Sequence, residues 1–266
     1  GSEKISAIDI GHYAAKVIQL QITNNSNTIK LLHAGRIDLP RDVVNNGKVV
    51  DPSLVERNLE NLFNQMNFKP DEAVTTIGSK NVIVRNISLP KMPEEELQEA
   101  LKWEVEDYLP YSVEDAVFDY VILNELNEEY ELIMVAAPKS SVDSYVSILR
   151  KLYIEPRAVN VQAIALFSLL SFQNVLEVPT AVIDIGASET RMIIGEKEKI
   201  YLARTVDTGG RDFTERLMKN EEEYSEAEQR KREITLENET ENEPEEDMSL
   251  DLALNQISEE GNTQSL

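Results

Sequence analysis

The pattern of apolar and polar positions predicts the same three-stranded unit twice along the chain. Residues 7–11 form a short apolar run that ends in Asp-x-Gly, and the same pattern returns at residues 182–186. In each copy a cationic residue follows the aspartate by seven positions, and two further apolar runs come after it. Apolar runs bounded by polar turns are typical of strands. The chain therefore predicts two related half-domains, with the Asp-Gly turns lining a cleft between them.

The segment between the two copies predicts mixed helices and strands. Asp51 and Pro52 precede apolar residues at helical spacing, which predicts a helix over residues 52–66 with Asp51 as its N-cap. Strands are expected at 73–78 and 82–89. After a proline-rich break, two amphipathic helices and a hairpin predict a small inserted unit.

Each Asp-Gly turn carries groups that suit a phosphate and a magnesium ion. A glycine lets main-chain N–H groups approach phosphate oxygens, and an aspartate at a strand end can hold Mg²⁺ or its water shell. Asp9 with Gly11, and Asp184 with Gly186, are therefore candidate ligand residues, and the two aspartates are candidate metal ligands. The alternative is that both turns are ordinary hairpin entries without a ligand.

A third glycine turn follows the second copy. Gly209 and Gly210 precede a stretch that predicts a helix, and the first N–H groups of that helix would be free to meet a phosphate. The alternative is a simple helix-entry turn.

Composition narrows the class of protein and of partner. A chain of 266 residues that is 41% hydrophobic and 6% aromatic fits an α/β protein, and the absence of cysteine excludes disulfides and thiolate metal sites. A net charge of −23 argues against a nucleic-acid partner, and about half of this excess lies in residues 219–266. No apolar run reaches the roughly 18 residues of a membrane span. The most apolar stretch, at 159–172, is expected to be a buried helix.

A set of short motifs follows in order over residues 4 to about 232. The motifs are Ala7-Ile8-Asp9-Ile10-Gly11 with Lys16, Gly47-Lys48-Val49-Val50-Asp51, Ile87-Ser88-Leu89-Pro90-Lys91-Met92, Trp103-Glu104 with Tyr108-Leu109-Pro110-Tyr111, Val135-Ala136-Ala137-Pro138-Lys139, Val182-Ile183-Asp184-Ile185-Gly186, and Gly209-Gly210 with Thr214. In this order and spacing the chain resembles the PilM proteins of type IV pilus assembly, members of the actin-like superfamily related to FtsA.

The resemblance implies an α/β, actin-like fold, in which an RNase H-like unit is duplicated and an FtsA-type subdomain, 1C, is inserted into the first half. The implied subdomains are the first part of 1A at 3–89, 1C at 90–157, the return to 1A at 158–176, the first part of 2A at 177–217, and an acidic, partly disordered part of 2B at 218–266.

The resemblance also implies that ATP and Mg²⁺ bind between the halves. The nucleotide-contacting residues that it implies are Asp9, Gly11, Lys16, Asp184, Gly186, Ala187, Thr190, Gly209 and Gly210. Family members usually carry small hydroxyl residues after the first glycine, whereas this chain has His12-Tyr13-Ala14-Ala15. Weaker phosphate contacts are expected there, because main-chain donors and Lys16 remain while the hydroxyl donors do not.

By comparison with the family, the returning part of 2A and its glycine-rich, adenosine-contacting turn are not found, so the second half is expected to be incomplete. Two explanations stay open: the chain is a truncated form, or it is a short variant that has abandoned the nucleotide. An incomplete sheet would leave an unpaired edge strand, which a partner or self-association would cover.

For function, the resemblance implies a non-catalytic adaptor in the cytoplasm, peripheral to the inner face of the cytoplasmic membrane. PilM-like proteins hold the short cytoplasmic N-terminus of a bitopic PilN-like protein in a groove beside 1C, and connect it to other pilus assembly components. Trp103, Tyr108 and Tyr111 are the candidate partner contacts, and the alternative is that these aromatic side chains belong to the core.

Two other functions stay open. In an ATPase or small-molecule kinase of the same superfamily, Asp9 and Asp184 would hold magnesium and Lys16 would meet a phosphate. Without an adenosine-contacting turn, ATPase activity is expected to be weak at most. An FtsA-like filament protein calls for a basic, amphipathic C-terminal membrane helix, whereas residues 258–266 are acidic.

Overall fold

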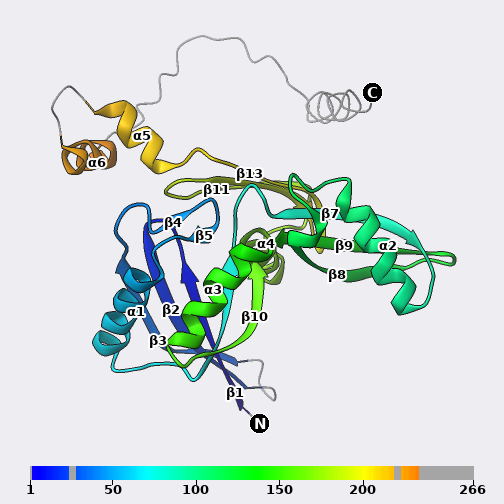
Figure 1. Cartoon of the computed structure of the whole chain (residues 1–266), viewed down its shortest axis with the longest axis horizontal. Coiled ribbons are helices and arrows are strands. Elements are labelled where there is room, and N and C mark those ends of the chain that lie inside the picture. Colours follow the sequence, from blue (N-terminus) through cyan, green and yellow to red (C-terminus); the bar gives the residue numbers. More distant parts are fainter. Residues whose placement is uncertain (1, 24–27, 219–222, 234–266) are drawn as a thin grey trace.

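The computed structural model describes residues 2–23, 28–218 and 223–233, which form three main sheets with helices packed against them (Figure 1). Most of the segment expected to be 2B, with its acidic run, lies outside these residues.

The first sheet has five strands in the order β10-β6-β1-β2-β3. Its strands are β1 (Ser2–Ile10), β2 (Ala14–Thr23), β3 (Thr28–Asp38), β6 (Glu72–Ile77) and β10 (Glu155–Val161). β2 is antiparallel to β1 and β3, whereas β6 runs parallel to β1 and to β10. The three-stranded meander predicted at the start of the chain is confirmed.

Two helices cover this sheet and share one hydrophobic core with it. α1 (Pro52–Met66) begins where predicted, because the Asp51 side chain accepts a 3.0 Å hydrogen bond from the N–H of Leu54. α3 (Lys139–Lys151) packs beside α1. The buried side chains of this core include Ile8, Ile10 and Val17 from the sheet, Val55, Leu59 and Leu62 from α1, and Tyr145, Ile148 and Leu149 from α3.

The second sheet, here called the small sheet, lies at the opposite end of the molecule from α1 (Figure 1). It comprises β7 (Ile83–Pro90), β9 (Glu129–Pro138) and β8 (Ala116–Glu125), all antiparallel to their neighbours. α2 (Glu94–Glu106) covers one face through Leu97, Leu101 and Val105. The 3₁₀ turn η1 (Val113–Asp115) leads into β8, and β4 (Val44–Asn45) with β5 (Lys48–Val49) forms a separate two-stranded ladder.

The small sheet differs from the expected insertion at both of its boundaries. β7 was expected to belong to the first subdomain, yet it pairs with β9 along its whole length. α3 was expected to belong to the insertion, yet it packs on the first sheet. Strand pairing and core contacts therefore group β7, β8 and β9 with α2, and α3 with the first sheet.

The third sheet repeats the meander of the first. It comprises β11 (Thr180–Ile185), β12 (Thr190–Glu196) and β13 (Lys199–Val206), all antiparallel. α4 (Gln162–Phe172) joins it to the first sheet. The buried helix expected at 159–172 is only partly correct: residues 159–161 finish β10, and Phe172 is 72% exposed.

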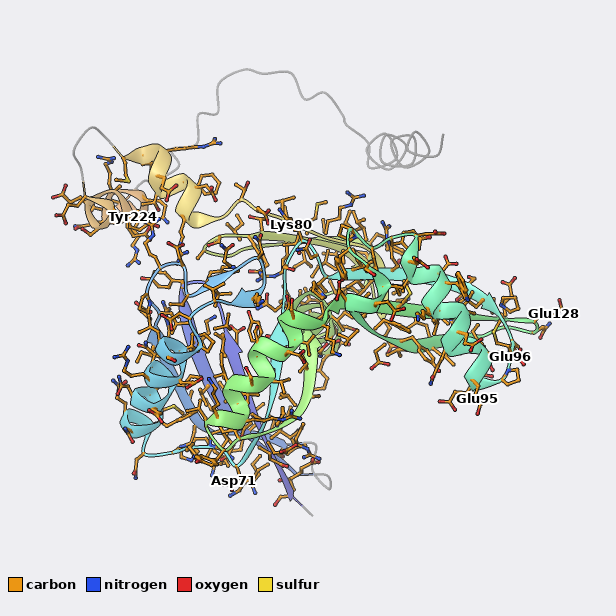
Figure 2. All side chains as sticks on the ribbon, in the orientation of Figure 1. Asp71, Lys80, Glu95, Glu96, Glu128 and Tyr224 are labelled. Atoms are coloured by element: carbon orange, nitrogen blue, oxygen red, sulfur yellow. The ribbon has the colours of Figure 1, made fainter. Side chains whose placement is uncertain are left out.

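The first and second halves touch at several points. The second half is the third sheet with α5 (Gly210–Leu217) and α6 (Tyr224–Glu233). Arg41, in the loop after β3, pairs with Glu215 at 2.6 Å and lies 4.0 Å from the centre of the Tyr224 ring. Lys80 pairs with Asp207. Figure 2 labels Tyr224 in α6 and Lys80 beside the third sheet.

Candidate functional site

A cleft of about 420 Å³ lies between the turns of the two repeated hairpins. The first turn joins β1 to β2 and the second joins β11 to β12. In each turn the glycine N–H donates to the carbonyl oxygen three residues later: from Gly11 to Ala14 at 3.1 Å and from Gly186 to Glu189 at 2.8 Å. The duplicated sequence therefore folds into duplicated turns that face one cleft.

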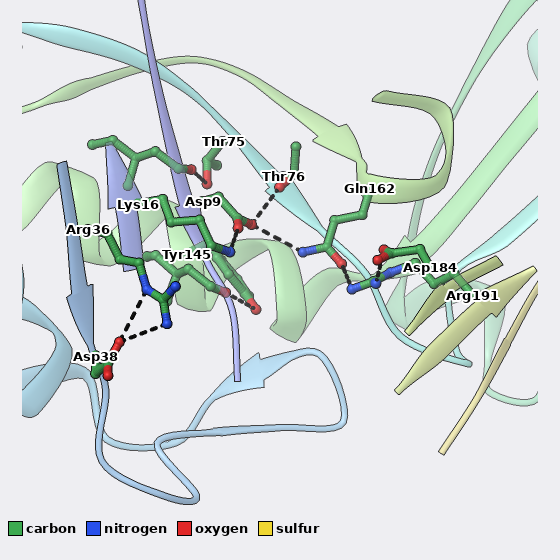
Figure 3. A network of polar contacts seen from close by, with 12 residues as sticks. Asp9, Lys16, Arg36, Asp38, Thr75, Thr76, Tyr145, Gln162, Asp184 and Arg191 are labelled. Carbon is green, nitrogen blue, oxygen red and sulfur yellow. Dashed lines mark hydrogen bonds and ion pairs between the residues drawn. The ribbon is translucent and has the colours of Figure 1, made fainter. Parts of the chain in front are cut away.

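In the first half, Asp9 lies opposite Lys16 in the β1–β2 ladder. Lys16 Nζ is 2.7 Å from Asp9 Oδ2, and its side chain remains half exposed. Asp9 Oδ1 accepts hydrogen bonds from Thr76 at 3.2 Å and from Gln162 at 3.3 Å (Figure 3). Both carboxylate oxygens of Asp9 are therefore paired within the protein.

The second half repeats this pairing with an arginine in place of the lysine. Asp184 lies opposite Arg191, and the two side chains are 2.6 Å apart. Arg191 also donates to Oε1 of Gln162, the amide of which reaches Asp9 (Figure 3). A continuous polar network thus connects the two halves across the cleft.

The carboxylates do not form a metal cage. Within the described residues no group of three or more His, Cys, Asp or Glu side chains could hold a metal ion. Magnesium often binds through one or two carboxylates together with substrate phosphates and waters. Asp9 and Asp184 could each supply such a carboxylate without further protein ligands. Lys16 and Arg191, the cations beside them, suit a phosphate.

The glycine pair before α5 packs closely against the second turn. A Cβ on Gly209 would lie 2.7 Å from atoms of Ala187, so only glycine fits. The N–H of Gly210 donates to Gly186 and that of Gly209 to Asp212 Oδ2 at 2.7 Å. The expectation that these N–H groups are free for a phosphate is therefore wrong, because the chain's own oxygens already accept from them.

The structure brings together six of the nine residues expected to contact the nucleotide. Those lining the cleft are Asp9, Gly11, Lys16, Asp184, Gly186 and Ala187. Thr190, Gly209 and Gly210 do not line it, and the Thr190 hydroxyl donates to the carbonyl oxygen of Thr208 at 2.6 Å.

A second depression, here called the groove, lies between the small sheet and the start of α3. Its volume is about 540 Å³, and its lining comprises Asn81, Tyr111, Asp115, Pro138, Lys139, Ser140 and Asp143. The Tyr111 hydroxyl donates to the main-chain oxygen of Asn81 at 3.0 Å, and burial raises the pKa of Tyr111 to about 12. Tyr111 is thus held at the wall of the groove.

The other two aromatic candidates lie outside the groove lining. Trp103 is 74% exposed on α2. The Tyr108 hydroxyl donates to Glu104 at 3.3 Å, and the Arg85 guanidinium lies 5.1 Å from the Tyr108 ring centre. Neither side chain is a core residue, so the alternative that these aromatic residues belong to the core does not hold for Trp103 and Tyr108.

Comparison with known proteins decides the family. A model of the family described as "Type IV pilus assembly protein PilM" matches residues 7–250. The chain belongs to this family. The solved PilM–PilN type IV pilus biogenesis complex contains a chain that matches with a TM-score of 0.77 and 26% identity, over 86% of this chain and 69% of that one.

Two weaker matches have TM-scores below 0.5. The ethanolamine utilization protein EutJ from Carboxydothermus hydrogenoformans gives a TM-score of 0.47 and 14% identity, over 86% of this chain and 61% of that chain. A Ppx/GppA family member from Aquifex aeolicus gives 0.40 and 14%, over 86% and 59%.

The family and the fold expected from the sequence are confirmed: this PilM family member has an actin-like α/β fold and is a type IV pilus assembly protein. In the described part of the chain, no helix has the length and apolar character that crossing a membrane requires.

Sequence reasoning missed several residues of the cleft. Gln162 begins α4 and lies 153 positions from Asp9, so no local pattern points to it. Glu189 is 3% exposed, and its pKa is raised to about 7, chiefly by burial and also by Asp207. In the sequence, only the position of Glu189 in the second Asp-Gly turn pointed to its place in the cleft.

Sequence reasoning also missed Arg211. It is the second residue of α5, and its side chain is only 12% exposed. Its guanidinium donates to the carbonyl oxygen of His12 in the first turn at 2.5 Å and to Ser188 in the second at 3.2 Å. One cation therefore bridges both turns. Burial, with Arg211 and then Arg191, lowers the pKa of His12 to about 4.

Proposed function

We propose that this protein is an adaptor in type IV pilus assembly that holds the cytoplasmic N-terminal segment of a PilN-like inner-membrane protein. The match to a chain of the PilM–PilN complex over 86% of this chain carries the proposal. Through that segment the protein would associate with the inner face of the cytoplasmic membrane and connect it to other pilus assembly components.

The groove beside the small sheet is the proposed seat of the segment. Tyr111 and Pro138 offer it apolar surface, while Asp115 and Asp143 can pair with a cationic side chain. Exposed apolar side chains of β8 lie on the same small sheet, with Val121 62% exposed. A short extended segment with alternating apolar and basic residues matches this surface.

A synthetic peptide that copies the first residues of the PilN-like partner tests the proposal by calorimetry. We expect Tyr111→Ala to weaken binding at least tenfold, because buried aromatic anchors dominate small interfaces. Trp103 is the only tryptophan of the chain, so its emission reports whether the peptide passes α2. Tyr108→Ala tests the remaining aromatic candidate. Folded protein that binds no peptide would disprove the adaptor, and peptide binding unaffected by both Tyr111→Ala and Tyr108→Ala would disprove the seat.

We further propose that the cleft takes the phosphate chain of ATP and that Asp9 or Asp184 would hold Mg²⁺ there. Lys16, Arg36 and Arg191 line the cleft, and a cluster of cations beside a glycine turn suits phosphate oxygens. Magnesium would neutralise phosphate charge. Lys16 would bind the phosphates, and Gln162 would hold the two halves in their relative positions.

Equilibrium dialysis with labelled ATP, with and without magnesium, measures this binding. Lys16→Ala is expected to abolish it, while Lys151→Ala, a change on the outer side of α3, serves as the matched control. Binding that Lys16→Ala leaves intact would place the nucleotide elsewhere. Binding accompanied by phosphate release would favour the ATPase alternative over the pure adaptor.

A further inference from the structure

The cleft contains two buried polar atoms for which the described part of the protein offers no hydrogen-bond partner. They are Oε2 of Glu189 and Nε of Arg191. Glu189 is 3% exposed and Arg191 is 9% exposed. Buried polar groups in folded proteins are nearly always paired, because leaving one unpaired costs about 1–3 kcal/mol. The two atoms therefore mark a place where something other than the described residues completes the hydrogen bonds.

The two residues share one side of the third sheet. Glu189 closes the second turn, and Arg191 lies two positions further, in β12. Alternate residues of a strand point to the same face, and both residues line the cleft together with Lys16. The terminal nitrogens of Arg191 are already engaged with Asp184 and Gln162. Its Nε–H has no partner among the described residues.

The charges that face Glu189 come from three elements. Arg191 in β12 and Lys80 before β7 favour its ionised form, while Asp207 after β13 disfavours it. Both cations have carboxylates of their own, because Lys80 pairs with Asp207 and Arg191 with Asp184. Burial outweighs them and raises the pKa of Glu189 to about 7. A protonated carboxyl group has an O–H that can donate a hydrogen bond.

We infer that Glu189 binds a phosphate group as a neutral acid, donating from Oε2 to a phosphate oxygen while Nε–H of Arg191 donates to the same group. This inference rests on the phosphate site proposed above and adds that the carboxyl group of Glu189 is protonated when the phosphate is bound. An ionised Glu189 would repel the same phosphate. Binding therefore draws a proton from solvent onto the carboxyl group, and Lys16 supplies positive charge within the same cleft.

Titration calorimetry with two probes, ATP and inorganic pyrophosphate, tests the inference. At each pH, two buffers of different ionisation enthalpy give the number of protons taken up on binding. We expect the wild type to take up roughly half a proton at pH 7 more than Glu189→Gln, because a carboxyl group with a pKa of about 7 is half ionised there. At pH 8 the wild type should bind about tenfold more weakly than Glu189→Gln.

Glu196→Gln is the matched control, since Glu196 lies at the other end of β12 and should keep the wild-type proton uptake. Glutamine has the shape of neutral glutamic acid, and circular dichroism checks that both variants fold. Equal proton uptake by Glu189→Gln and the wild type overturns the inference but leaves the nucleotide site standing. Failure of both probes to bind overturns the inference and the nucleotide site, while the peptide experiment decides the adaptor independently. Equal behaviour of ATP and pyrophosphate assigns the contact to the phosphates alone.

Discussion

The guanidinium of Arg211 donates a 2.5 Å hydrogen bond to the main-chain oxygen of His12, a residue 199 positions earlier in the chain. The same guanidinium reaches Ser188, so one side chain from α5 holds the turns of both hairpins. The width of the cleft depends on this contact as well as on the sheets that carry the turns.

Replacing Arg211 by alanine should lower the free energy of unfolding by about 2 kcal/mol, because a buried, charged donor to a main-chain oxygen is lost. Arg216→Ala, on the exposed side of the same helix, should change it by less than about 0.5 kcal/mol. Urea denaturation of the two variants measures both values. Equal effects would mean that Arg211 does not tie the turns together.

Gln162→Ala should destabilise the protein by about 1–3 kcal/mol, because it removes the amide between Asp9 and Arg191. Gln162→Glu should be worse above pH 5 than below it, since it places a second carboxylate beside Asp9. Gln173→Ala, at the exposed end of α4, is the control. Thermal unfolding monitored at several pH values would reveal either pattern, and a harmless Gln162→Ala would contradict the bridge.

Glu189 should make the protein less stable as the pH rises. Folding raises its pKa from 4.5 to about 7, so the folded state binds more protons than the unfolded state in this range. Its contribution is most favourable below pH 4.5 and is lost as the pH passes 7, by on the order of 3 kcal/mol. Denaturation curves of Glu189→Gln should lack this loss. A parallel pH dependence in variant and wild type would contradict the assignment.

His12 should act in the opposite direction. Folding lowers its pKa from 6.5 to about 4, so the unfolded state binds the additional proton. Stability is therefore lost as the pH falls from 6.5 towards 4. His12→Gln should flatten this part of the stability curve when denaturation is followed at several pH values. Should the variant keep the wild-type acid limb, other groups would have to cause it.

The sequence predicted what is local in this fold. The spacing between Asp9 and Lys16 places them on opposite strands of one hairpin, and the structure shows them as a cross-strand pair. The same holds for Asp184 and Arg191. The N-cap of α1 at Asp51 could likewise be predicted, because capping depends on neighbours three residues away.

The sequence could not show which element packs against each buried face of a helix or sheet. The amphipathic pattern of α3 shows that one side is buried, but either the small sheet or the first sheet could have covered it. Gln162 and Arg211 join the site through contacts over more than 150 positions, which no residue spacing encodes. The N–H groups before α5 were misjudged because Asp212 and the second turn accept from them.

The ties between the halves have a calorimetric consequence. Domains joined by a linker alone melt independently, and each gives its own heat-absorption peak. Here the pairs Arg41–Glu215 and Lys80–Asp207 fasten α5 and β13 to loops of the first sheet. Unfolding of one half therefore removes contacts that stabilise the other half. We expect the described residues to unfold in a single cooperative step.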